Sequence, residues 1–312
     1  MTTRARPVVG VGLLVGVVAI STSAILARVA MGADPGVTRA LPGAAPALAI
    51  AFWRTVGGAL ALAPLAIRHQ RRARTPVTAL DHRWLVLAGA ALALHFALFQ
   101  GSLALTSVAS AVTLATASPV FVALGAWWVL REATTRRVRW GMVLTMVGAA
   151  TIGIADATGH GPGAVALVGD VMALGSAVAM SAYLLTGRAA RPRVGAATYS
   201  AIVYGWAGLG LGAICLALGV PLTGYRAATW LAIAGIVVGP QLLGHTVFNA
   251  LLSRVTATVV ALAVLAEPLG AGVLAWLLLG ELPAPGFWLG GPLVLAGVGI
   301  AATRGSRRRG AA

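Results

Sequence analysis

Six ionisable side chains stand inside long apolar stretches of this chain, and they are its first candidates for chemistry. A charged side chain at the centre of a lipid bilayer costs about 2.5–3.5 kcal/mol on insertion scales, so such residues pair with one another or line the path of an ion or substrate. The six are Arg28, Arg54, His95, Asp170, His245 and Glu267.

Glu267 is the strongest of these candidates because it directly precedes Pro268 in the middle of an apolar stretch. Proline removes a backbone donor and frees the carbonyl four residues earlier, here that of Val264. A low-dielectric surrounding favours the neutral form of a carboxyl group, which suits it to exchanging protons near neutral pH. The alternative is a structural carboxyl that bonds to a hydroxyl or a tryptophan of a neighbouring helix.

Asp170 and Arg54 are expected at a similar depth from the outer face of the membrane. Opposite charges at one depth predict an ion pair, which would be either an outer gate or a buried structural salt bridge. The structural salt bridge is the simpler interpretation.

Two histidines and two amides are the remaining candidates. His95 and His245 are placed near the middle of their spans, where an imidazole could relay protons or bind an anion. Gln100 and Asn249 each follow a histidine by about one helical turn and would suit recognition of a carboxylate or an amine. Packing and interhelical hydrogen bonding are the alternative roles for all four.

Several kinds of chemistry are excluded by residues that the chain lacks. Lysine is absent, so neither a phosphate-binding loop lysine nor a Schiff base can form. Cys215 is the single cysteine, which leaves no internal disulfide and no zinc cluster. No converging catalytic set is recognisable. We therefore expect no enzymatic activity, no cofactor and no metal.

Composition predicts an integral membrane protein. Of the 312 residues 59% are hydrophobic and 10% charged, whereas about a quarter of a soluble domain is charged. Apolar stretches of about 20 residues can each cross a hydrocarbon core of roughly 30 Å. The predicted spans are 8–30, 46–67, 84–105, 110–130, 138–156, 163–187, 196–219, 228–251, 257–279 and 286–303. The expected fold class is thus all-α, with ten transmembrane helices.

Arginine placement predicts the orientation. With a cytoplasmic N-terminus, nineteen arginines fall inside and only Arg39 and Arg226 fall outside. This bias follows the positive-inside rule, so both termini are predicted on the cytoplasmic side of the cytoplasmic (inner) membrane. The net charge of +16 therefore does not indicate nucleic-acid binding, for which a basic surface on a soluble fold would be needed. The arginine-rich tail 304–312 is expected to contact anionic lipid headgroups.

The two halves of the chain look duplicated at an offset of 149 residues. The identities in this register are Pro119 with Pro268, Trp127 with Trp276, Glu132 with Glu281, Gly141 with Gly290 and Gly148 with Gly297. The predicted repeats are 8–156 and 157–303, between a short cytoplasmic N-terminus (1–7) and the tail. Both prolines are predicted helix breaks. We expect Glu132 and Glu281, which end their spans, to be structural.

An odd number of helices in each repeat makes the second copy enter the membrane from the opposite side. Inverted repeats of this kind supply inward-open and outward-open states of similar energy, and transporters use them for alternating access. A duplicated scaffold without transport is the alternative. Glycines at four-residue spacing would pack the bundle or join two copies into a homodimer.

Two blocks of sequence resemble a known family. The block GSLALTSVASAVTLATASPVFVALGAWWVLRE at 101–132 is similar to the third and fourth helices of an EamA domain of the drug/metabolite transporter superfamily. The block at 248–281 resembles the same segment of a second EamA domain, including its Glu-Pro and Gly-Glu marks. At Arg131-Glu132 the chain departs from the family, which more often has Gly-Glu there.

The resemblance implies a secondary active transporter, an antiporter that exports small molecules such as amino acids, related metabolites or drugs. It also implies that the proton is the coupling ion. Two alternatives stay open, a flippase for lipid-linked substrates and a non-transporting membrane assembly protein.

Overall fold

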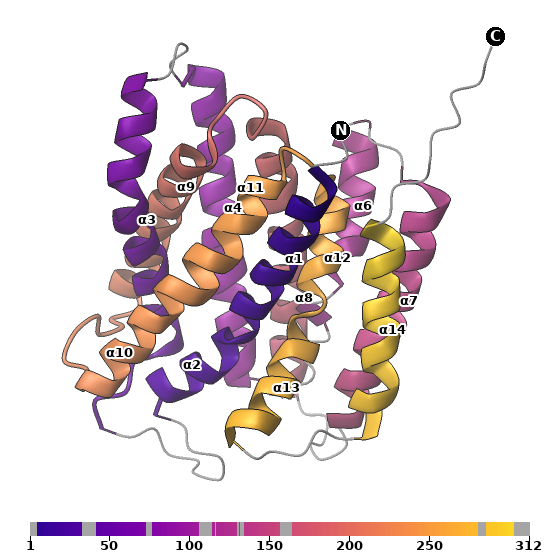
Figure 1. The fold of residues 1–312 in the computed structure, drawn as a ribbon. Helices are drawn as coiled ribbons and strands as arrows, with labels where there is room; N and C mark the ends of the chain where they lie inside the picture. Colours follow the sequence, from indigo (N-terminus) through magenta and orange to yellow (C-terminus); the bar gives the residue numbers. More distant parts are fainter. Residues whose placement is uncertain are drawn as a thin grey trace.

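The computed structural model describes residues 5–32, 42–72, 77–105, 114–115, 117–129, 131, 134–156, 164–279 and 285–302. Regular structure within these ranges is helical throughout (Figure 1). The helices of the first half are α1 (Ala5–Ser21), α2 (Ser23–Ala30), α3 (Ala47–Arg72), α4 (Ala79–Leu105), α6 (Ser118–Val129) and α7 (Arg136–Asp156). Those of the second half are α8 (Ala164–Ala190), α9 (Ala196–Ala217), α10 (Ala227–Ile236), η1 (Val237–His245), α11 (Thr246–Leu251), α12 (Ala257–Val264), α13 (Glu267–Leu279) and α14 (Pro285–Ala302).

The lengths and the surface of these helices suit a bilayer. Six helical stretches of the described chain are long and apolar enough to cross a membrane, and shorter apolar helices accompany them. The six are Val8–Ala27, Ala47–Arg72, Asp81–Ser102, Leu167–Ala190, Ala196–Ala217 and Ala227–Leu251. Large apolar side chains such as Leu14, Leu60 and Leu216 point outward, where water would penalise them and lipid would not.

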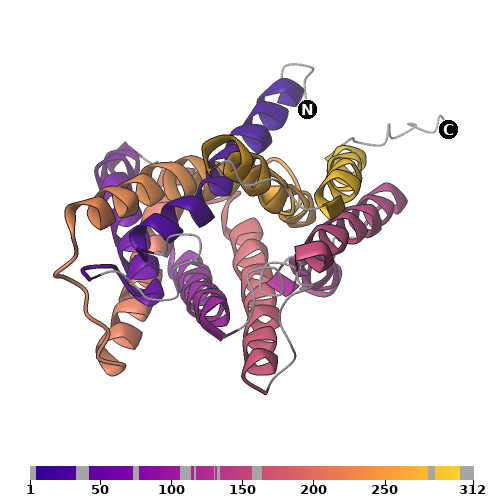
Figure 2. The same cartoon turned by 90° about the horizontal axis from the view of Figure 1, so that it is seen from below.

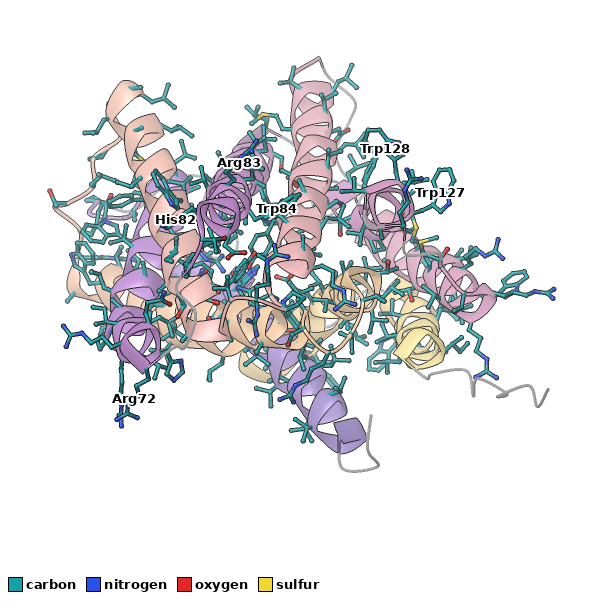
Figure 3. All side chains as sticks on the ribbon, turned by 90° about the horizontal axis from the view of Figure 1, so that it is seen from above. Arg72, His82, Arg83, Trp84, Trp127 and Trp128 are labelled. Atoms are coloured by element: carbon teal, nitrogen blue, oxygen red, sulfur yellow. The ribbon has the colours of Figure 1, made fainter. Side chains whose placement is uncertain are left out.

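Contacts between connections show which helix ends lie together. Arg193 Nε donates to Asp81 Oδ1 at 2.7 Å, so the end of α8 meets the start of α4. At the other end of the bundle the N–H of Arg226 donates to the carbonyl of Gly43 at 3.0 Å. The end of α8 and the start of α4 are uppermost in Figure 1, as are the start of α1 and the end of α14. Figure 3 looks onto this upper end, where Arg72 and Arg83 are labelled.

Exchanging the two halves leaves the pattern of helix contacts unchanged. α3 packs on α9 and α7 packs on α14, each a pair of equivalent helices. The packing of α1 and α2 against α10, η1 and α11 matches that of α8 against α4, and α6 with α8 matches α12 and α13 with α1. Seen from below, the α7–α14 pair and the α3–α9 pair lie at opposite sides of the bundle (Figure 2). α1 begins at the upper end and its equivalent α8 ends there, so the second half is inverted relative to the first.

Glycines of the repeat bring α7 and α14 into close contact. A Cβ added to Gly148 would lie 2.6 Å from the carbonyl oxygen of Gly290, and one added to Gly297 would lie 2.6 Å from that of Gly141. These two contacts are equivalent at the offset of 149 residues, so the two-fold axis passes between the helices. The repeated glycines are therefore required by backbone approach.

Candidate functional site

Three interruptions of regular helix meet in the core. α1 and α2 are separated at Thr22, η1 is a π-helix that contains Pro240, and α12 and α13 are separated at Leu265–Ala266. The first two contact each other, and α1 also contacts both α12 and α13. π-Helical turns and broken membrane helices are common at functional sites, because they expose backbone groups that a regular helix would use.

The break beside Glu267 is present in both halves. Pro268 is the second residue of α13, a position where the missing N–H of proline is not needed. The Ala266 N–H donates to the Ala263 carbonyl at 3.0 Å, and the Ala117 N–H donates to the Leu114 carbonyl at 3.1 Å, two equivalent hydrogen bonds at the 149-residue offset. In the first half Ser118 stands where the second half has Glu267.

Arg54 lies in the core with two direct contacts. Its Nε donates to Gln241 Oε1 at 2.9 Å, and its guanidinium carbon lies 4.3 Å from the centroid of the Phe96 ring. The residue is only 4% exposed. Among the acidic side chains, Glu267 is the one whose charge acts on Arg54 most strongly. The core thus holds a cation and a carboxyl from opposite halves of the chain.

His95 and His245 gather around the same aromatic ring. His95 Nδ1 lies 3.0 Å from the carbonyl oxygen of Ser176, and its ring centroid lies 5.1 Å from that of Phe96. His245 meets the Phe96 ring edge-on, with centroids 5.7 Å apart. Both imidazoles are within electrostatic range of Arg54. Arg54 and the two imidazoles thus surround one aromatic ring.

Asn249 is fully engaged by neighbouring hydroxyls. It accepts a hydrogen bond from Tyr183 at 2.6 Å and donates to Ser200 at 3.1 Å and to Tyr204 at 3.4 Å. Gln100, its equivalent at the 149-residue offset, is buried, but its Oε1 has no hydrogen-bond partner within the described chain. The second amide of this kind is Gln241, whose Nε2 lacks a partner there as well. Unpaired buried amides are costly unless a ligand or water reaches them.

Comparison with known proteins decides the family. The model of the EamA-like transporter family matches residues 14–154 and again residues 167–303. The chain belongs to the EamA-like transporter family. It is therefore a multi-pass membrane transporter of the drug/metabolite type.

A solved structure supports the fold of this EamA-like chain. A protein with a solved crystal structure is 23% identical to it, with a TM-score of 0.73 over 94% of this chain and 96% of the other. A search of curated proteins gave no significant match. The two proteins thus share a fold. The substrate class has to be inferred from the side chains of the core.

Several predicted residues of the EamA-like chain lie apart from this cluster. Asp170 is half-buried in α8, while the contacts described for Arg54 are with Gln241 and Phe96, so the pairing of Asp170 with Arg54 stays a prediction. Arg28 lies in α2, and its side chain is outside the description. Glu132, Glu281 and the tail 304–312 also lie outside the described residues.

Sequence reasoning missed Gln241, although it is a polar residue within an apolar span. It was overlooked because only ionisable groups and repeat-related amides were considered. Pro240 beside it is a signal that could have found it, since proline within a helix frees backbone groups. Among the described residues, no three His, Cys, Asp or Glu side chains come together as metal ligands would.

Proposed function

We propose that this chain is a ten-helix antiporter that exports small zwitterionic metabolites, amino acids or close relatives, in exchange for protons. The observation that carries the proposal is the placement of the buried Arg54 and the half-buried Glu267 within electrostatic range of each other, where the interrupted helices meet. A substrate with both a carboxylate and an ammonium group complements this pair.

Each half of the site has a chemical task. The guanidinium of Arg54 offers a planar set of donors to a carboxylate, and the unpaired Nε2 of Gln241 adds one more. Glu267 receives either a proton or the ammonium group of the substrate. Because one carboxyl cannot hold both, proton entry releases substrate and substrate entry releases the proton, which is the requirement for exchange.

The inverted halves supply the movement. Two copies of one unit in opposite orientations allow the same site to open to either side at similar energy. With the arginine-rich end of the bundle in the cytoplasm, both termini are cytoplasmic and the membrane is the cytoplasmic one. Export is the direction in which an inward proton gradient drives such an exchange.

Proteoliposome transport tests the proposal. A panel of amino acids and cationic drugs would be assayed under an imposed proton gradient with native protein, Glu267→Gln and Glu267→Asp. We expect a proton-driven flux of amino acids that Glu267→Gln abolishes and Glu267→Asp partly retains. Proton-driven flux in Glu267→Gln equal to native would contradict the proposal. Silence across the panel from folded protein would instead direct attention to lipid transfer.

A further inference from the structure

Two buried serines make the same junction in the two halves of the chain. Ser21 Oγ lies 2.7 Å from the Val17 carbonyl oxygen in its own helix and 3.3 Å from the carbonyl oxygen of Glu267. Ser181 Oγ lies 2.7 Å from the Ala177 carbonyl oxygen and 3.0 Å from the carbonyl oxygen of Ser118. In each case a serine of the first helix in one half reaches the helix break in the other half.

Ser21 and Ser181 are equivalent, although the 149-residue register does not align them. Ser118 and Glu267 are 149 residues apart, whereas Ser21 and Ser181 are 160 residues apart. The longer offset is supported by Arg28 with Arg188 and by Ala30 with Ala190. The first half thus has 11 more residues than the second between the serine of its first helix and its helix break.

The junction at Ser21 is tightly packed. Ser21 is fully buried, and a Cβ added to Gly270 of α13 would collide with its side chain. α1 therefore holds the first turn of α13, the turn that carries Glu267. The twin junction at Ser181, which is 3% exposed, holds a turn that carries only a hydroxyl.

We propose that Ser21 is a positioning residue for proton exchange: by holding the backbone carbonyl of Glu267, it sets the direction in which the carboxyl group leaves the helix break. Ser181 makes the matching junction without a proton-carrying group. The duplicated break is thereby specialised, with proton exchange in the second half alone. The role assigned to the carboxyl group rests on the proposed function.

The other charges near this carboxyl group are few. Arg54 of α3 lies within electrostatic range of it. The described side chains of α1, α13 and α14 carry no further ionisable group, and Arg28 of α2 has no described side chain. A change at Ser21 therefore acts through the position of Glu267 relative to Arg54.

Infrared titration of the purified protein tests this role without a known substrate. The absorption of the protonated carboxyl group that disappears in Glu267→Gln would be followed against pH in native protein, Ser21→Ala, Ser181→Ala and Ser21→Thr. We expect Ser21→Ala to move the midpoint by about one pH unit, a tenfold change in protonation equilibrium. Ser181→Ala loses an equivalent hydrogen bond and should leave the midpoint unchanged, while Ser21→Thr should restore it.

Equal midpoints in Ser21→Ala and Ser181→Ala, whether shifted or not, would overturn the positioning role. If Ser21→Ala does not fold, Ser21→Cys replaces it, because a thiol fills the space with a weaker donor. This outcome is distinguishable from failure of the proposed function. In that case Glu267→Gln would transport as native protein does, while the Glu267 carboxyl band of native protein would still titrate.

Discussion

At the scale of the residue, the core of this transporter is defined by how a buried cation is satisfied. Arg54 has an amide acceptor, an aromatic face and a carboxyl within electrostatic range, each from a different helix. A buried guanidinium requires such partners because an unpaired charge in a low-dielectric core is strongly unfavourable. In the proposed function a substrate carboxylate takes over part of the hydrogen bonding of Arg54.

Removing the charge of Arg54 should weaken substrate binding. Arg54→Gln is expected to lower the apparent affinity for a carboxylate substrate by about 10- to 100-fold, since a hydrogen bond to a charged group contributes about 1.5–3 kcal/mol. The measurement is the concentration dependence of uptake in proteoliposomes. Arg68→Gln, at an exposed position of the same helix, is the control and should behave as native. Unchanged affinity in Arg54→Gln would remove Arg54 from the binding site.

Gln241 should matter for stability as well. Gln241→Leu leaves the Nε of Arg54 without its acceptor, and we expect a loss of about 1–3 kcal/mol in unfolding free energy. Thermal unfolding in detergent, followed by tryptophan fluorescence, would show this as a lower Tm. Gln70→Leu, near the end of α3, is the matched control. If both variants have the Tm of native protein, the Arg54–Gln241 hydrogen bond does not stabilise the fold.

At the scale of the element, the irregular helices and the helices that cross at glycines lie in different parts of the bundle. Proline and π-helix interrupt the helices that meet at the site, whereas α7 and α14 pair closely at the side of the bundle. Glycines allow that pairing because their backbones touch. The proposed site and the close glycine-mediated pairing thus lie on different helices of each repeat.

The glycine crossing can be tested at two equivalent positions. Gly148→Ala and Gly297→Ala each place a methyl group against a backbone carbonyl of the partner helix, so we expect both to lose about 1–3 kcal/mol, as overpacked cores do. Gly299→Ala, in the same helix α14, has nothing within 4 Å of the added methyl group and should be neutral or slightly stabilising. Differential scanning fluorimetry compares the three. A Tm for Gly299→Ala below that of the other two would contradict the close crossing.

At the scale of the whole molecule, the inverted halves give the bundle two chemically different ends. The upper end in Figure 1 carries Arg72, Arg83 and the Arg193–Asp81 ion pair. At the lower end the backbone N–H of Arg226 donates to the carbonyl of Gly43, and the ring of Trp53 contacts that of Trp230. If the arginine-rich end faces the cytoplasm, as we propose, the ion pair is expected at the inner end of the interface between the halves.

This orientation is open to cysteine labelling. Cys215 is buried, and in a Cys215→Ser background single cysteines would replace the exposed residues Arg72, at the upper end, and Thr223, before α10. We expect a membrane-impermeant thiol reagent to label Thr223→Cys in intact cells and Arg72→Cys only in inside-out vesicles. The reverse pattern would invert the transporter in the membrane and, with it, the predicted side of the termini.

Local patterns in the sequence determined much of this protein. Hydropathy and arginine placement predict an apolar helical bundle and its orientation, because both depend on residues taken a few at a time. The 149-residue register placed Pro119 on Pro268 and Gly148 on Gly297, and the structure gives these pairs equivalent environments. The family resemblance agrees with the match to the EamA-like family over both halves.

Tertiary structure alone decided which polar side chains meet. Arg54 reaches Gln241, and Ser21 reaches Glu267, because the crossing of helices and the direction of each side chain select partners 187 and 246 residues away. Depth in the membrane, which the sequence does indicate, allows many such pairings and selects none. The first helices are also offset by 160 rather than 149 residues, so no single register could reveal the serine junctions before the halves were seen packed together.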